Sequence, residues 1–314
     1  MRNAKFCFLV CTCCVFVSLL AGCTRDDRRW KQQIDAADDA KNAGNYQEEE
    51  THLLAALHEA ESFGEDARHA TTLDRLALVS INLGHYQDGE EYGKLAVAMS
   101  ERVNGPDHID TAYSLGNLAE AYVEQRKYTE AEALHKRALA IMEKTLGPEN
   151  EKVATVLNDL AAMYHDEKRN AEAESLYKRS EAIREKVLGP EHPDLAATFN
   201  NLGDLYRHQH EYDKAEPYYR RALTIAEKAL GAKHPSVAAV LDNLAHLYYE
   251  QGRYADADPL LARALPIWVS AVGPNSRDVA INLTTHAAVL HKLGRHQEAT
   301  AKELQAQQIQ DHPQ

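Results

Sequence analysis

Cysteine is missing from most of this 314-residue chain, since every cysteine lies within the first 23 residues. Residues 24–314 therefore cannot form a disulfide, which excludes a disulfide framework and argues against a plain secreted form. The five cysteines are Cys7, Cys11, Cys13, Cys14 and Cys23.

Positive charge is also scarce. The chain has 35 Lys and Arg against 48 Asp and Glu, which gives a formal net charge of −13. Phosphate backbones are bound by clustered Lys and Arg, so this balance argues against a nucleic-acid partner. It equally argues against electrostatic attachment to a membrane surface, so we expect any membrane attachment to come through a lipid alone.

Motifs of catalysis are absent too. The sequence contains no Ser-His-Asp order, no nucleophile elbow, no phosphate-binding loop and no HExxH. The acidic pairs Glu130/Glu132 and Glu172/Glu174 are one repeat apart, which predicts a solvated helix face instead of a facing acid–base pair. We therefore predict a protein that is not an enzyme, with no cofactor, no bound metal and no small-molecule substrate.

The chain has one long apolar run, at residues 6–20, preceded by Arg2 and Lys5. It is short for a membrane span, which needs about 20 residues. A positive start, a short apolar core and small residues before a cut site are typical of a secretory signal. A plain signal peptide and an uncleaved anchor are two possible interpretations of this run.

The end of this run, Leu20-Ala21-Gly22-Cys23, resembles a bacterial lipobox. The resemblance implies cleavage after Gly22 and lipidation of Cys23 with a diacylglyceryl group and an N-acyl chain. Thr24 stands where an aspartate would favour inner-membrane retention. The expected location is therefore the bacterial cell envelope, lipid-anchored and facing the periplasm, at the outer membrane in preference to the inner.

One string recurs along the remainder at a fixed interval of 42 residues, as Gly-Pro or a close variant of it. A constant period in this range predicts a solenoid, in which each unit buries its apolar flank against its neighbours. Such stacks present a surface to a partner more often than they form a pocket for chemistry. The string begins at Gly105, Gly147, Gly189, Gly231 and Gly273.

Residues 189–230 illustrate one unit. Asp194 is expected to cap a first helix that runs to about residue 209, because its carboxylate can accept from free backbone N–H groups. Residues 208–212 are expected to turn, and a second helix to run from about 213 to 230. Gly231 is expected to end that helix in a left-handed conformation.

Small and apolar residues recur in a fixed order in this unit: Phe199, Leu202, Gly203, Tyr206, Ala215, Tyr219 and Ala222. This order and spacing resemble the tetratricopeptide repeat over residues 64–310. The longer unit is similar to the kinesin-light-chain type, whose Leu-Asn-Asn-Leu is nearly matched by residues 199–202. Glu227 departs from the ordinary repeat, which has a proline there. The resemblance implies an all-α fold, a right-handed superhelical solenoid of antiparallel helix pairs with about seven units.

We predict four segments: a signal peptide at 1–22, a lipidated tether at 23–29, a solenoid at 30–310 and a frayed tail at 311–314. The terminal units are expected to be caps, because end repeats need a polar outer face. Within the solenoid the predicted units are a degenerate cap at 30–63, repeats at 64–104, 105–146, 147–188, 189–230 and 231–272, and a polar unit at 273–310.

The sixteen histidines invite a metal hypothesis. His108, His192 and His234 recur at multiples of the period, so we expect stacking to keep them apart in structural linker roles. His208, His210 and His246 are expected to be surface or groove residues.

The predicted binding surface is the first helix of each unit. By the resemblance, its fifth, sixth and ninth positions line a concave groove for an extended ligand. Asparagine recurs there, and its amide can both donate to and accept from a peptide backbone. Acidic neighbours favour a neutral or basic protein segment as partner. The predicted groove residues are Asn117, Asn158, Asn200, Asn201, Asn243, Asp204, Arg207, His246 and Tyr249.

Two alternatives stay open. The asparagines could be ordinary polar residues of an exposed helix face, or could only bridge neighbouring repeats. The whole chain could be a structural array that associates with itself and has no ligand in the groove.

Overall fold

The computed structural model describes residues 27–311. The predicted signal peptide, the lipidation site Cys23 and most of the predicted tail lie outside these residues. Residues 27–29, which we assigned to the tether, already belong to a helical segment at 27–42.

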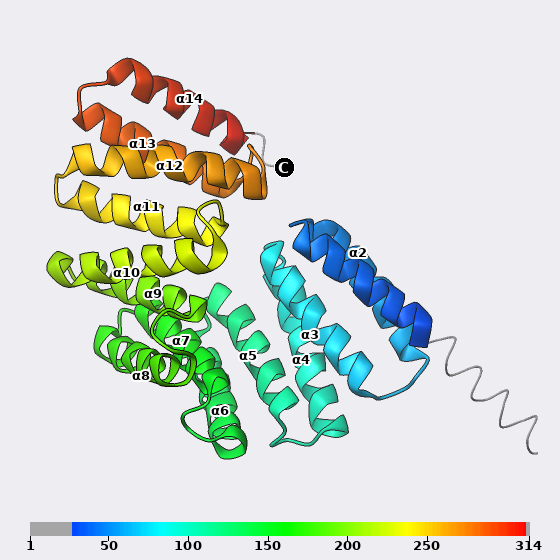
Figure 1. Ribbon diagram of the computed structural model, residues 1–314. Coiled ribbons are helices and arrows are strands. Elements are labelled where there is room, and N and C mark those ends of the chain that lie inside the picture. Colours follow the sequence, from blue (N-terminus) through cyan, green and yellow to red (C-terminus); the bar gives the residue numbers. More distant parts are fainter. Residues whose placement is uncertain (1–26, 312–314) are drawn as a thin grey trace, which may run out of the picture. The chain divides into compact units, whose positions relative to one another are not determined.

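Within the described range every regular element is a helix, which confirms the all-α class and the solenoid of repeated helix pairs (Figure 1). The helices after residues 27–42 are α2 (Tyr46–Glu61), α3 (Ala67–Asn82), α4 (Tyr86–Val103), α5 (Ile109–Glu124), α6 (Tyr128–Leu146), α7 (Glu151–Asp166), α8 (Asn170–Leu188), α9 (Pro193–His208), α10 (Tyr212–Leu230), α11 (Pro235–Glu250), α12 (Tyr254–Val272), α13 (Arg277–Lys292) and α14 (His296–Asp311).

The chain divides into two compact units, Met1–Ile141 and Met142–Gln314. The first contains residues 27–42, α2–α5 and the start of α6. The second contains the end of α6 and α7–α14, which stack in chain order (Figure 1). From α3 onward, each predicted repeat corresponds to one pair: an odd-numbered first helix, called the A helix here, and an even-numbered second helix, called the B helix.

The cap of α9 is His192, two residues before the expected cap at Asp194. The ring nitrogen Nδ1 of His192 accepts from the backbone N–H of Asp194, and Pro193 is the first helical residue. Proline fits there because its fixed φ suits a helix and its missing N–H would have had no partner. His108 and His234 cap α5 and α11 in the same way. The prediction of Asp194 as the cap was therefore wrong, and the linker role predicted for these histidines is that of the cap itself.

Glycine ends the B helices as expected. Gly189, Gly231 and Gly273 follow α8, α10 and α12 with φ between 87° and 89°. Side chains disfavour this left-handed region, so glycine is the residue that meets the requirement without steric cost. The 42-residue string is thus a helix stop followed directly by a helix start.

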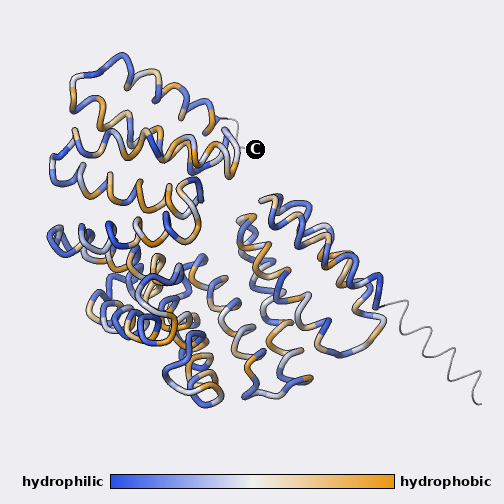
Figure 2. Tube along the Cα trace, in the orientation of Figure 1, coloured by the Kyte–Doolittle hydropathy of each residue, from blue (hydrophilic) through white to orange (hydrophobic). Residues whose placement is uncertain are grey.

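Hydrophobic residues recur along every helix instead of forming one continuous run (Figure 2). Small residues recur in the core at the positions of Gly203 and Ala215 in other repeats: Ala161, Ala173, Ala215 and Ala245 have no exposed surface. Gly203 marks the closest approach, because a Cβ there would lie 2.8 Å from the ring of the fully buried Tyr219. Small residues let the helix axes approach, and Leu and Tyr fill the space between them.

The A helices form the inner layer of the second unit. Consecutive A helices contact one another, α7 with α9, α9 with α11 and α11 with α13, in addition to their contacts with B helices. Among α8, α10, α12 and α14, no two B helices make contacts of similar extent. The stack therefore curves with its A helices on the inside, which places the predicted groove residues on the inner side.

Candidate functional site

All nine predicted groove residues lie on A helices and are half-buried. Asn117 lies on α5 in the first unit. The other eight lie on α7, α9 and α11 in the second unit, which therefore holds the candidate site.

Side chains on neighbouring A helices pair at a separation of 43 residues, one more than the repeat. Asn201 Nδ2 donates to Asn158 Oδ1 at 3.5 Å, and Asn243 Nδ2 donates to Asn200 Oδ1 at 3.0 Å. In the first unit Asn117 pairs with Asp74 at the same separation. The predicted asparagines thus form polar bridges between repeats, called rungs here.

Each asparagine rung leaves most of its hydrogen-bonding capacity unused, because one hydrogen bond joins two amide groups. Within residues 27–311, no protein group pairs with the Asn243 carbonyl or with the Asn200 amide N–H groups. The same holds for the Asn201 carbonyl and the Asn158 N–H groups. A half-buried acceptor and a half-buried donor therefore lie side by side on two successive rungs, an arrangement that suits an extended peptide backbone.

A chain of charges follows the rungs along the same face. Arg207 donates to Asp204 Oδ1 at 2.6 Å and to Glu250 Oε1 at 2.5 Å. Burial opposes ionisation of Asp204, but Arg207 outweighs it and holds the pKa of that carboxyl below its ordinary value. Two carboxylates thus neutralise one guanidinium, and this group of three residues carries a net negative charge.

His246 and Tyr249 lie one repeat further along, on α11. His246 Nε2 is 3.2 Å from the Thr285 hydroxyl, and burial lowers the pKa of this imidazole. The Tyr249 ring meets Tyr254 edge-on, with centroids 5.4 Å apart. They add a neutral polar group and an aromatic surface to the inner face.

Two further acids on A helices, Asp74 and Asp242, hold neighbouring repeats together. Asp74 accepts from Ser114 and Asn117, and Asp242 accepts from Trp268 Nε1 and Asn282 Nδ2 at 2.8 and 2.6 Å. Burial raises the pKa of each carboxyl to about 6. Asp242 is therefore held by partners on α12 and α13 instead of being free to contact a ligand.

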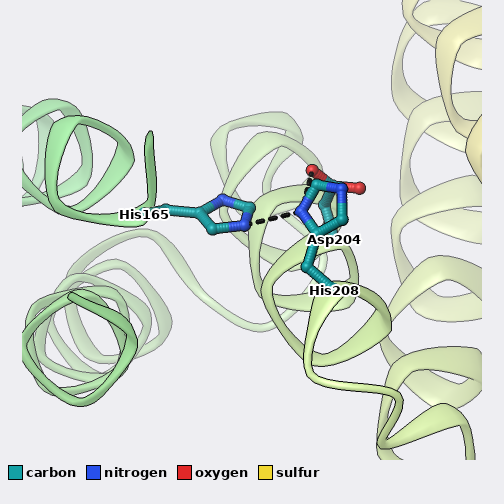
Figure 3. A group of neighbouring side chains, drawn as sticks. All are labelled: His165, Asp204 and His208. Atoms are coloured by element: carbon teal, nitrogen blue, oxygen red, sulfur yellow. Dashed lines mark hydrogen bonds and ion pairs between the residues drawn. The ribbon is translucent and has the colours of Figure 1, made fainter. Parts of the chain in front are cut away.

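Sequence reasoning missed a cluster formed by His165, Asp204 and His208 (Figure 3). His165 Nε2 lies 2.8 Å from His208 Nδ1, which in turn lies 3.6 Å from Asp204 Oδ2. The two histidines are 43 residues apart, so they occupy another rung. The expectation that stacking keeps histidines apart was made for His108, His192 and His234, and His165 and His208 do not follow it. The 43-residue separation was the available signal.

Within residues 27–311, no helix combines the length and the apolar character that crossing a membrane requires.

Comparisons with known proteins agree with the repeat architecture. The tetratricopeptide-repeat family model matches residues 68–144, 152–228, 194–268 and 236–311. A comparison with curated protein sequences finds no match.

Solved structures with similar folds include nearly identical tetratricopeptide-like repeats of a putative kinesin light chain from Podosopora anserina. That structure is 27% identical, with 64% of this chain and 94% of that chain covered and a TM-score of 0.53. Apo RapI is 15% identical, with 90% and 97% covered and a TM-score of 0.65. A signal-transduction ATPase with a tetratricopeptide-repeat sensor, from Pyrococcus horikoshii, is 19% identical, with 85% and 39% covered and a TM-score of 0.65. The last two likenesses concern the fold alone.

Proposed function

Since the chain belongs to the tetratricopeptide-repeat family, whose members generally bind other proteins, we propose that it is a scaffold or assembly factor. It holds an extended segment of a partner against the inner face of α7, α9 and α11. It is attached through lipidated Cys23 to a membrane of a bacterial envelope and faces the periplasm, at the outer membrane in preference to the inner.

The observation that carries the binding proposal is the unused capacity of the two asparagine rungs. A half-buried amide group without a partner loses hydrogen bonds to water that only a ligand or an ordered water can replace. The Asn200 N–H groups and the Asn243 carbonyl match the C=O and N–H groups of an extended backbone. Such contacts are independent of the ligand's side chains, so the neighbouring charges decide which segment is preferred.

Those charges favour a neutral or basic segment. Arg207 is already held by Asp204 and Glu250, and only 13% of its side chain is exposed. It cannot clamp an acidic peptide without giving up these carboxylates. The net negative charge of this group instead attracts Lys or Arg, and the net charge of −13 of the whole chain acts in the same direction.

The binding proposal is tested with two pairs of substitutions. Asn201→Ala with Asn243→Ala removes both rungs and two of the unused carbonyls. Asn158→Asp with Asn200→Asp keeps the accepting Oδ1 of each rung and replaces the unused N–H groups with a carboxylate oxygen, whose added negative charge by itself would favour a basic segment. We expect both double variants to lose most of the crosslinking that a photoreactive residue at position 249 gives in native envelopes, with helical content unchanged by circular dichroism.

The aspartate pair is the decisive comparison. If it crosslinks like the wild type while the alanine pair does not, the asparagines only support the stack and the groove proposal is wrong. A photoreactive residue at position 233, in the linker after α10, is the positional control and should not give the same products.

The anchoring proposal is supported by the lipobox-like sequence and by the absence of other cysteines after residue 23. Cys23→Ala should abolish incorporation of labelled palmitate and move the chain out of the membrane fraction. Cys14→Ala, nine residues earlier in the apolar run, is the matched control and should retain both. If the wild-type chain is found in the membrane fraction but does not incorporate the label, the apolar run is an uncleaved anchor instead.

A further inference from the structure

Two histidines and an aspartate meet where α7 and α9 end their last turns on the inner face. In Figure 3 the His165 and His208 rings point toward each other from the two helices, with Asp204 one turn before His208. One ligand-type atom of each residue lies within 4.8 Å of the others. Imidazole nitrogen and carboxylate oxygen are the donor atoms that zinc and similar ions prefer besides thiolate.

The hydrogen bonds fix the protonation of the two rings. Arg207 has only N–H donors and lies 2.7 Å from His208 Nε2, so this nitrogen accepts and His208 Nδ1 carries the hydrogen. His208 Nδ1 then donates to His165 Nε2 at 2.8 Å. His165 Nε2 therefore accepts this hydrogen bond, and the lone pair that accepts it is the one a metal ion would take.

We propose that His165 Nε2, His208 Nδ1 and Asp204 Oδ2 bind a divalent transition-metal ion of the zinc class, which replaces the hydrogen bond between the rings. The proposal goes beyond partner binding and does not depend on it, since uptake of an ion is measured without any partner.

The three donor atoms must shift to reach a tetrahedral arrangement around an ion. In a tetrahedral site with bonds of about 2.05 Å, donor atoms lie about 3.3 Å apart. The two nitrogens are at 2.8 Å and the His208–Asp204 pair at 3.6 Å, so these pairs need shifts of about half an ångström or less. The donor atoms of His165 and Asp204 lie within 4.8 Å of each other and need a shift of at most about 1.5 Å, which rotation of side chains at the helix ends provides. Half of the His208 side chain is exposed, which leaves space for a water or an external ligand as the fourth donor.

A second shell already orients the aspartate. Asp204 Oδ1 accepts from Arg207 Nη2 at 2.6 Å and from the Tyr219 hydroxyl at 3.2 Å, which leaves Oδ2 directed toward His208. Partners of this kind fix a ligand's orientation and raise metal affinity. Arg207 also competes, because an ion on His208 Nδ1 moves the hydrogen to Nε2 and Arg207 must release that nitrogen. Arg207 keeps its hydrogen bonds to Asp204 and Glu250 when it releases His208 Nε2.

The test is equilibrium dialysis of the full chain against Zn²⁺, with its cysteines alkylated so that thiolates do not bind the ion. We expect one Zn²⁺ per chain that depends on the cluster. His165→Gln and His208→Ala should each weaken this binding by about 100-fold, at least as much as loss of an outer-shell partner costs. His210→Ala is the matched control, since His210 contacts Tyr212 instead of the cluster and should bind as the wild type does.

Differences among the variants identify the site, because other histidines add weaker background binding. Wild-type affinity in both cluster variants, or no saturable uptake by the wild-type chain, overturns the proposal. His208→Ala removes a half-exposed side chain, and unchanged helical content by circular dichroism separates loss of a ligand from loss of the fold.

Discussion

Three turns between A and B helices place a side chain where other repeats have glycine. Arg126, Lys168 and His210 have φ of 59°, 62° and 60°, whereas Gly84 and Gly252 occupy the equivalent positions with φ of 77° and 74°. A non-glycine residue in this left-handed region costs roughly 1 kcal/mol, and within residues 27–311 the exposed Lys168 side chain makes no hydrogen bond or ion pair that compensates.

Lys168→Gly should therefore stabilise the protein. The gain is about 0.5–1 kcal/mol, after the greater flexibility of glycine in the unfolded chain is subtracted. Lys168→Ala is the control: it removes the same side chain but keeps the strained backbone, so its stability should equal that of the wild type. Urea unfolding measures both, and equal gains from Ala and Gly would assign the effect to lysine's charge instead of backbone strain.

At the scale of helices, the sequence predicted the number and order of the hairpins but not how their side chains pair. The glycine stops and the apolar columns follow from local rules, so α9 and α10 lie where residues 189–230 indicated. His192 as the cap was missed because aspartate is the commoner cap, although Pro193 marked the first helical position. Bridging between repeats was kept as an alternative, but the pairs were not predicted, because helix crossing adds one residue to the period and this offset is a property of packing, not of the repeat.

Arg184 ties three helices together from inside the stack. Its guanidinium donates to the Asp194 carbonyl and the Thr198 hydroxyl of α9 and to the Thr155 hydroxyl of α7, while its Nε has no partner. Only 5% of the residue is exposed, and this burial lowers its pKa. The charged group therefore has a large desolvation cost that its neutral partners offset only in part.

Arg184→Met should keep the stability within about 1 kcal/mol of the wild type or raise it, because methionine fills the space without a buried charge. The chain itself provides the model, since Met142 is buried one repeat earlier in the same column. Arg184→Ala leaves a cavity and should cost about 2–4 kcal/mol. If urea unfolding shows equal losses for Met and Ala, the hydrogen bonds of Arg184 matter more than its volume.

At the scale of the whole molecule, each compact unit contains one buried carboxyl at the same repeat position. Asp74 in the first unit and Asp242 in the second have a pKa raised to about 6 by burial. A folded carboxyl with a raised pKa takes up a proton before the unfolded one does. Its favourable contribution is therefore complete below pH 3.8 and is lost as the pH rises through 6.

The two acids differ in how they can accommodate that proton. The Ser114 hydroxyl, which donates to Asp74, can instead donate to the Asp110 carbonyl and accept from a protonated Asp74. Trp268 Nε1 and Asn282 Nδ2 can only donate to Asp242, so its protonation loses a hydrogen bond. We therefore expect the pH response to be clearer at Asp74.

Asp74→Asn should remove that response, because the amide imitates the protonated acid. Buried histidines act in the opposite direction: burial lowers the pKa of His135 to about 4, so acidification destabilises the fold through this residue.

The prediction therefore concerns the difference in unfolding free energy between the wild type and the Asp74→Asn variant. Between pH 7 and pH 5 the wild type should gain about 1 kcal/mol relative to Asp74→Asn in urea unfolding, since one pKa unit corresponds to about 1.4 kcal/mol. Asp213→Asn, an exposed carboxylate on α10, should change with pH as the wild type does. A constant difference between wild type and Asp74→Asn across this range would show that the Asp74 carboxyl stays ionised in the folded protein, and the first unit would then lack the acid-stabilised contact inferred from its burial.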